Sequence, residues 1–181
     1  MPTMPNRRDV LIGLALAAAS CAAAGAHTPY GQWVVYRQKH LLIGAHRGDA
    51  RTYELAQAVV AALEDELPEA RPRVARGPRP QRITSLMGTG QLFVSVLSAD
   101  EAERMVDALP PFENYTPTPL RILATLEGEY HVFVSPDLPE DHAWLVTRAL
   151  DHAQLGHRPD RVSIPLHPGA VTFWEGGSMP D

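Results

Sequence analysis

An apolar stripe at helical spacing, directly after a short apolar run, constrains the fold of this chain most strongly. Four side chains recur at every fourth position: Leu55, Val59, Leu63 and Leu67. Charged and amide side chains stand between them, so the pattern predicts an amphipathic helix over about residues 52–67, which Pro68 ends. The preceding run Leu41–Gly44 predicts a buried strand. A strand followed by a one-sided helix indicates an α/β domain, because each element needs the other to bury its apolar face.

The alternation of strands and helices continues along the chain. Further strands are expected at residues 73–76, 92–97, 120–126 and 130–134, and further helices at 81–87, from Ser98 to about Leu109, and from about 140. Ser98 and Glu101 fit a capping box, in which the serine accepts from a helix amide and the glutamate reaches back. Asp137 and Glu140 repeat this spacing, with Pro139 in the first turn. These patterns predict one α/β lobe with a mainly parallel sheet flanked by helices.

Composition limits the classes of function. A length of 181 residues suits one domain, and a net charge of −5 gives no basic groove for nucleic acid. The arginines between positions 71 and 82 alternate with prolines, and we interpret this stretch as a solvated connection. Cys21 is the only cysteine and lies in the N-terminal apolar stretch, so the domain after it has no internal disulfide and no cysteine-based zinc site.

The sequence carries no pattern typical of catalysis. It contains no nucleophile elbow, phosphate loop or paired-carboxylate motif. His152 and His157 are five positions apart, which does not place them on one helix face as a metal pair. We therefore expect no enzyme activity, no metal site and no cofactor.

Residues 1–26 are expected to be a signal peptide for export. Arg7 and Arg8 form a charged start, and the uncharged, alanine-rich run Val10–Ala24 is too short for a comfortable transmembrane helix. The stretch Asn6–Leu11 resembles a twin-arginine export signal. A periplasmic or otherwise extracytoplasmic location follows from this prediction.

Two routes of processing fit the end of this segment. Ala22–Ala24 or Ala24–Ala26 would serve an ordinary signal peptidase. Ala18–Cys21 resembles a lipobox, and processing there would place a lipid anchor on Cys21. Residues 27–40 are then expected to form an exposed lead-in to the domain.

Three stretches resemble the TAXI family of TRAP-type solute-binding proteins. The most specific is the closing segment Ile164–Glu175, where His-Pro-Gly-Ala leads into an aromatic-rich last helix. The second runs from Ile43 to Leu63 and includes a Thr-Tyr pair, and the third is Ser85–Ser98. Leu120–Ala124 is similar to the strand that leads to the family's hinge. The resemblance covers residues 41–175, and residues 176–181 form a tail.

The resemblance implies a type II periplasmic-binding-protein-like fold reduced to one lobe. In the family, a second lobe is inserted between two hinge strands, whereas here Tyr130–Ser135 runs almost at once into the expected C-terminal helices. The implied function is binding of a small carboxylate for uptake or sensing, with TRAP-type membrane subunits as partners. The alternative is a non-catalytic interaction module that docks a membrane transporter or an exported redox enzyme. A homodimer or another envelope protein would be one way to replace the missing second lobe on the other side of the ligand.

The loop between the first strand and the first helix is the expected ligand site. Amides at the start of a helix bind anions, and an arginine can hold a carboxylate bidentately. The alternative interpretation is a solvated loop that only connects strand to helix, and the capping role of Ser98 already accounts for that residue. His167 is more typical of a turn before Pro168 than of a catalytic base. The predicted ligand-binding residues are Arg47, Gly48, Arg51, Thr52, Tyr53 and Ser98.

Overall fold

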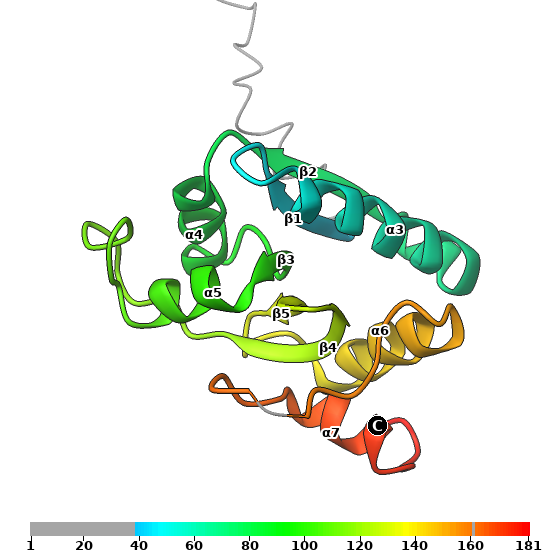
Figure 1. Ribbon diagram of the computed structural model, residues 1–181. Helices are drawn as coiled ribbons and strands as arrows, with labels where there is room; N and C mark the ends of the chain where they lie inside the picture. Colours follow the sequence, from blue (N-terminus) through cyan, green and yellow to red (C-terminus); the bar gives the residue numbers. More distant parts are fainter. Residues whose placement is uncertain (1–38, 161) are drawn as a thin grey trace, which may run out of the picture. The chain divides into compact units, whose positions relative to one another are not determined.

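Strands and helices alternate through the part of the chain that the computed structural model describes, residues 39–160 and 162–181. These residues belong to one compact unit, Arg37–Asp181. The predicted signal peptide, Cys21 and all but the last two residues of the predicted lead-in lie outside the described residues. The elements (Figure 1) are β1 Leu42–His46, α3 Ala50–Glu66, the 3-10 turn η1 Pro68–Ala70, β2 Arg73–Gly77, α4 Pro80–Gly88, β3 Val94–Ser98, α5 Ala99–Val106, β4 Arg121–Glu127, β5 Tyr130–Val134, α6 Glu140–His152 and α7 Pro168–Trp174.

The five strands form one mixed sheet in the order β2-β1-β3-β5-β4. β1 is parallel to β2 and to β3, whereas β5 is antiparallel to both of its neighbours, β3 and β4. The prediction of a mainly parallel sheet is therefore wrong for half of the strand pairs. The reason is the connection between β4 and β5, which consists of Gly128 and Glu129 alone. A two-residue turn reverses the chain, and Gly128 adopts the positive φ of 51° that such a turn favours in glycine.

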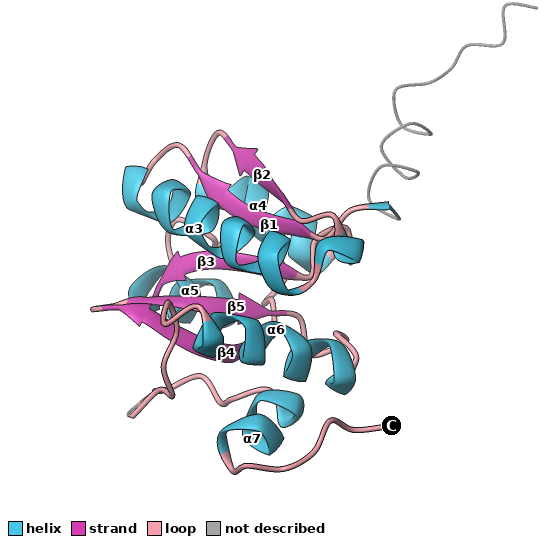
Figure 2. Cartoon of the chain, turned by 90° about the vertical axis from the view of Figure 1, so that its right-hand side faces the viewer, coloured by secondary structure: helices cyan, strands magenta, loops and turns pink. Residues whose placement is uncertain are grey.

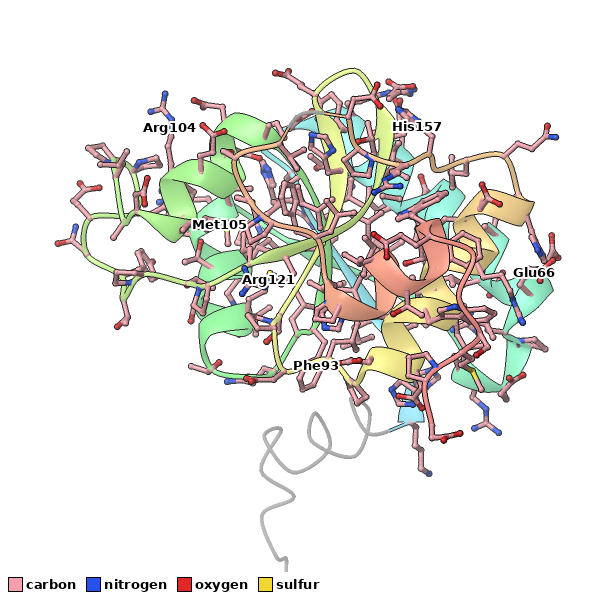
Figure 3. All side chains as sticks on the ribbon, turned by 90° about the horizontal axis from the view of Figure 1, so that it is seen from below. Glu66, Phe93, Arg104, Met105, Arg121 and His157 are labelled. Carbon is pink, nitrogen blue, oxygen red and sulfur yellow. The ribbon has the colours of Figure 1, made fainter. Side chains whose placement is uncertain are left out.

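Helices cover both faces of the sheet. α3 and α6 lie on one face and α4 and α5 on the other (Figures 1 and 2). The predicted stripe of α3 is confirmed as a core face, because Leu55, Val59 and Leu63 are buried against strand residues. On the opposite face Met105 of α5 is buried, while its neighbour Arg104 points outward (Figure 3).

The helix ends confirm one predicted cap and correct another. Ser98 caps α5 by accepting from the amide of Glu101, but the Glu101 carboxylate does not reach back and bonds His46 instead. α6 has no side-chain cap: Pro139 occupies the N-cap position, so it does not stand in the first turn, and the amide of Asp137 donates to Ser135 Oγ. α5 ends at Val106 rather than near Leu109, because Ala108 adopts a left-handed φ of 50°.

The C-terminal segment folds back along the free edge of β4. Backbone bonds join Thr125 to His157 and Ile122 to the stretch before α7. His167 then caps α7, its Nδ1 accepting from the amide of Gly169 at 3.2 Å. The interpretation of His167 as a turn-forming residue is therefore confirmed. No helix among the described residues is long and apolar enough to cross a membrane.

Candidate functional site

The carboxyl ends of β1 and β3 form a topological switch point. The chain leaves β1 for α3 on one face of the sheet and leaves β3 for α5 on the other. Two neighbouring strands whose connections diverge in this way leave a crevice outside their carboxyl ends, which is where open α/β sheets bind ligands. The position where such a crevice is expected, called the crevice below, lies between the residues that follow β1 and the first turn of α5.

His46 and Glu101 meet across this crevice. His46 is the last residue of β1 and only 1% exposed, and its Nε2 lies 3.1 Å from Glu101 Oε2. A carboxylate only accepts hydrogen bonds, so Nε2 carries a proton, and in the neutral tautomer that makes this contact Nδ1 is an acceptor. Nδ1 is buried and has no hydrogen-bond partner among the described residues. Leaving a buried polar atom unpaired costs about 1–3 kcal/mol, so this nitrogen marks an unsatisfied position in the crevice.

Exposed Gly48 lies over the unpaired nitrogen. A Cβ at Gly48 would stand 3.0 Å from His46 Nδ1, closer than nine in ten real Cβ contacts. A side chain at this position would therefore press on the imidazole ring. The predicted ligand-binding residue Gly48 has a structural reason to be glycine, and that reason is its position against His46.

Arg51 is already neutralised by protein carboxylates. Its guanidinium binds Glu127 through Nε, at 2.6 Å, and through a second nitrogen, and it binds Glu54 at 2.7 Å. These contacts raise the pKa of Arg51, with Glu127 the larger cause, and the same guanidinium lowers the pKa of Glu127. Arg51 therefore fastens the start of α3 to the end of β4. Of the two arginines predicted to bind a ligand carboxylate, only Arg47 remains available for that role.

Thr52 and Tyr53 are occupied by contacts within the protein. Thr52 is buried, and its hydroxyl donates to the carbonyl oxygen of Asp49 at 2.9 Å. The Tyr53 ring lies under the guanidinium of Arg76, 4.0 Å from the ring centroid. The Thr52 hydroxyl also lies 3.4 Å from the carbonyl oxygen of His46, so Thr52 holds the backbone beside the site, whereas Tyr53 contacts β2.

Asp49 and Tyr130 complete the rim on the hairpin side. Asp49 caps α3 by accepting from the amide of Arg51 at 2.8 Å, and its second oxygen accepts from the Tyr130 hydroxyl at 2.9 Å. The hydrogen bond to Asp49, helped by burial, raises the pKa of Tyr130 to about 12. The phenol therefore stays neutral and holds the first residue of β5 against the first helix.

Two predicted residues, Arg47 and Ser98, lie beside the crevice. Arg47 is exposed, and its side chain has no bonding partner among the residues that the structure describes. Ser98 is partly buried, and its hydroxyl accepts from the Glu101 amide at 3.3 Å, so it positions the turn that carries Glu101. Sequence reasoning missed His46, Asp49 and Glu101 as members of this site, although the capping-box spacing did single out Glu101.

The larger cavity described lies elsewhere, beside η1 and α6. It measures about 380 Å³, and its apolar wall includes Leu67, Leu138 and Leu145. None of the predicted ligand-binding residues lines it. Lys39, the first described residue, forms part of its border, so its surroundings on that side lie outside the described residues. Because this cavity contains none of the predicted residues, we favour the crevice as the functional site.

Comparisons of the sequence with protein families and with curated proteins identify no relative. No family model matches the sequence, and no curated protein matches it. Within the described residues no group of three or more histidine, cysteine, aspartate or glutamate side chains could hold a metal ion.

Two buried histidines outside the crevice make the fold sensitive to acid. Burial lowers the pKa of His131, and nearby His157 lowers it further. Burial also lowers the pKa of His167, whose Nδ1 must stay unprotonated to accept from the Gly169 amide. Folding therefore opposes protonation of both rings.

We expect the free energy of unfolding to fall as the pH drops below about 6.5, the ordinary histidine pKa, because the unfolded chain then binds protons that these buried rings resist. Above that pH both states hold the rings neutral, so the contribution is fully present. His167→Asn keeps a capping side chain that does not titrate and should flatten the fall between about pH 7.5 and 5.5. Urea unfolding at each pH measures the slope. Exposed His142→Asn is the control, and an unchanged slope in His167→Asn would contradict the assignment.

Proposed function

We propose that this chain is an extracytoplasmic, non-enzymatic solute-binding protein of the TRAP/TAXI type, reduced to one lobe. It takes a small carboxylate at the crevice between β1 and β3. The resemblance of residues 41–175 to that family supports the proposal, as does an α/β lobe in which β4 and β5 are joined by two residues. The twin-arginine-like start of the sequence supports export.

The unpaired Nδ1 of His46 carries the proposal. It lies at the switch point, where ligands of open α/β sheets bind, and no described group forms a hydrogen bond with it. A small solute with a carboxylate and a hydroxyl or amine would meet both unsatisfied groups. Its carboxylate would bind the fork of Arg47, and its donor group would pair with His46 Nδ1, which lies behind Gly48.

A one-sided site predicts weak binding. Solute-binding proteins strengthen polar contacts by enclosing the ligand and excluding water, whereas Arg47 and Gly48 are exposed. An exposed charge contact contributes up to about fivefold in affinity, so two or three of them give a dissociation constant on the order of 10 mM. Uptake at lower solute concentration would then need a second wall from a partner.

Thermal unfolding with graded acetate, lactate and malate tests the proposal. Lactate and malate carry the extra hydroxyl, so both are expected to raise the melting temperature more than acetate does. Arg47→Ala should abolish the rise, and Arg158→Ala, which removes an exposed arginine after α6, should leave it intact. No rise with any of the three, or an equal rise in Arg47→Ala, would overturn the carboxylate site.

A further inference from the structure

We infer that residues 153–160, which follow α6 and lie along the free edge of β4, open in acid while the rest of the domain stays folded. They remain on β4 while the buried ring of His131 is neutral, and they leave it when that ring takes up a proton. These residues are called the return segment below (Figure 1). The inference concerns the edge of the sheet and does not rest on the proposed function.

Three side chains stand in one row across this edge. Thr125 of β4 lies opposite His131 in the antiparallel pairing with β5, and on its other side it lies opposite His157 of the return segment. Residues directly opposite each other on antiparallel strands present their side chains on the same face of a sheet. Thr125 therefore stands between two histidines, of which His131 is buried and His157 is exposed.

Thr125 is bonded to both of these neighbours. Its backbone amide donates to the carbonyl oxygen of His157 at 3.0 Å, and its carbonyl oxygen accepts from the His157 amide at 2.9 Å. Its hydroxyl oxygen lies 2.9 Å from Nδ1 of His131. The buried imidazole and the return segment thus share one anchor residue, the first through its side chain and the second through its backbone.

The return segment has few other anchors. Among the described residues, the two bonds to Thr125 are the only backbone hydrogen bonds of residues 157–160, and only Pro159 of these four is buried. Gln154, near the start of the segment, adopts a left-handed φ of 53°, which is strained for a residue other than glycine. Opening here breaks two hydrogen bonds and uncovers little surface, so it needs far less free energy than unfolding of the domain.

The ionisable groups around His131 come from α5 and from the return segment. β3 and β4 place the uncharged Leu97 and Thr125 opposite His131. From α5, Glu103 borders the same pocket of about 70 Å³ as His131. The return segment contributes three exposed groups, His157, Arg158 and Asp160.

These surroundings favour the neutral ring in the closed form. Burial lowers the pKa of His131, and His157 lowers it further, so Glu103 does not offset the cost of a buried positive charge. Opening lets water reach the ring, which then regains the ordinary histidine pKa of about 6.5. Closure is therefore fully favoured above that pH and weakens below it, because the opened form binds the proton more readily. From about pH 7.5 to pH 5.5, this shifts the balance toward the opened form by up to about tenfold.

Amide hydrogen exchange of the purified chain at about pH 7.5 and pH 5.5 tests the inference. Rates are expressed as protection factors, which removes the intrinsic pH dependence of exchange. The amides of Thr125 and His157 are expected to lose about three- to tenfold in protection at the lower pH. Their exchange should not change in low urea, because local opening exposes little surface, whereas amides of β1 and β3 that exchange through global unfolding respond to urea.

His131→Asn should remove the pH effect on these two amides, because asparagine can still pair with the Thr125 hydroxyl but does not titrate. His142→Asn, an exposed change on α6, is the control and should keep the loss seen in the parent chain. Persistence of the full loss in His131→Asn would overturn the assignment to that ring. If this variant does not fold, the parent chain still decides the matter. Protection that is independent of pH at Thr125 and His157, or a loss that follows urea as in β1 and β3, would overturn the local opening.

Discussion

Gly169→Ala is expected to lower the free energy of unfolding by about 3 kcal/mol, the upper end for overpacking of a buried site. Gly169 is buried in the first turn of α7, where that helix packs on the start of α6. A Cβ there would stand 2.1 Å from the carbonyl oxygen of Glu140 and 2.9 Å from its carbonyl carbon. Both are backbone atoms of α6, so no side-chain rotation relieves the overlap and the two helices must separate.

Separation of these helices would also remove other contacts of α7. The amide of Gly169 would leave Nδ1 of His167, and the indole of Trp174 would lose its bond to the carbonyl oxygen of Leu123, now 2.9 Å. Gly88→Ala is the matched control, since the nearest atom to its Cβ, Thr118 Oγ1, is 3.4 Å away. That change at the end of α4 should alter stability by less than about 1 kcal/mol. Urea unfolding measures both, and a Gly169→Ala protein as stable as the parent would show that α7 does not pack as described.

Leu63→Ala is expected to lower the free energy of unfolding by about 2–5 kcal/mol. Leu63 is 0% exposed and packs in the core between α3 and the sheet. Removing its side chain beyond Cβ loses the transfer free energy of the buried methyl groups and leaves a cavity that a packed interior closes only in part. The loss is therefore larger than the hydrophobic contribution alone.

Leu109→Ala provides the matched control, because Leu109 is 48% exposed in the loop after α5. The same chemical change at that position should cost well under 1 kcal/mol, as surface substitutions usually do. Urea unfolding of the two variants gives the difference directly. A loss below about half a kcal/mol in Leu63→Ala would mean that the stripe of α3 does not face a core.

The sequence predicted elements more reliably than their directions. The four-residue spacing of the α3 stripe and the serine cap of α5 are local patterns, and both are confirmed. The antiparallel direction of β5 could have been predicted from the sequence. Only two residues separate it from β4, and parallel neighbours need a much longer connection. We predicted a mainly parallel sheet because strands and helices alternate along the chain. The short turn at Gly128 has no helix in it, so it makes β5 antiparallel to its neighbours.

The candidate site depended on contacts that local patterns do not encode. His46 and Glu101 are 55 positions apart, and Asp49 and Tyr130 are 81 apart. The sequence placed Arg47, Gly48 and Arg51 in the right loop but could not show that Glu127 already holds Arg51. Strand order and register decide these neighbours.

The central claim is that one lobe, as a monomer, binds a small anion weakly at the crevice through Arg47. Calorimetric titration of a confirmed monomer with malate, for the parent chain and Arg47→Ala, tests it most directly. We predict a dissociation constant no tighter than roughly 0.1 mM for the parent, equivalent to 5–6 kcal/mol, and a loss of about fivefold or more in Arg47→Ala. A micromolar constant for the monomer, or equal binding by the two proteins, would contradict a one-sided site that depends on this arginine.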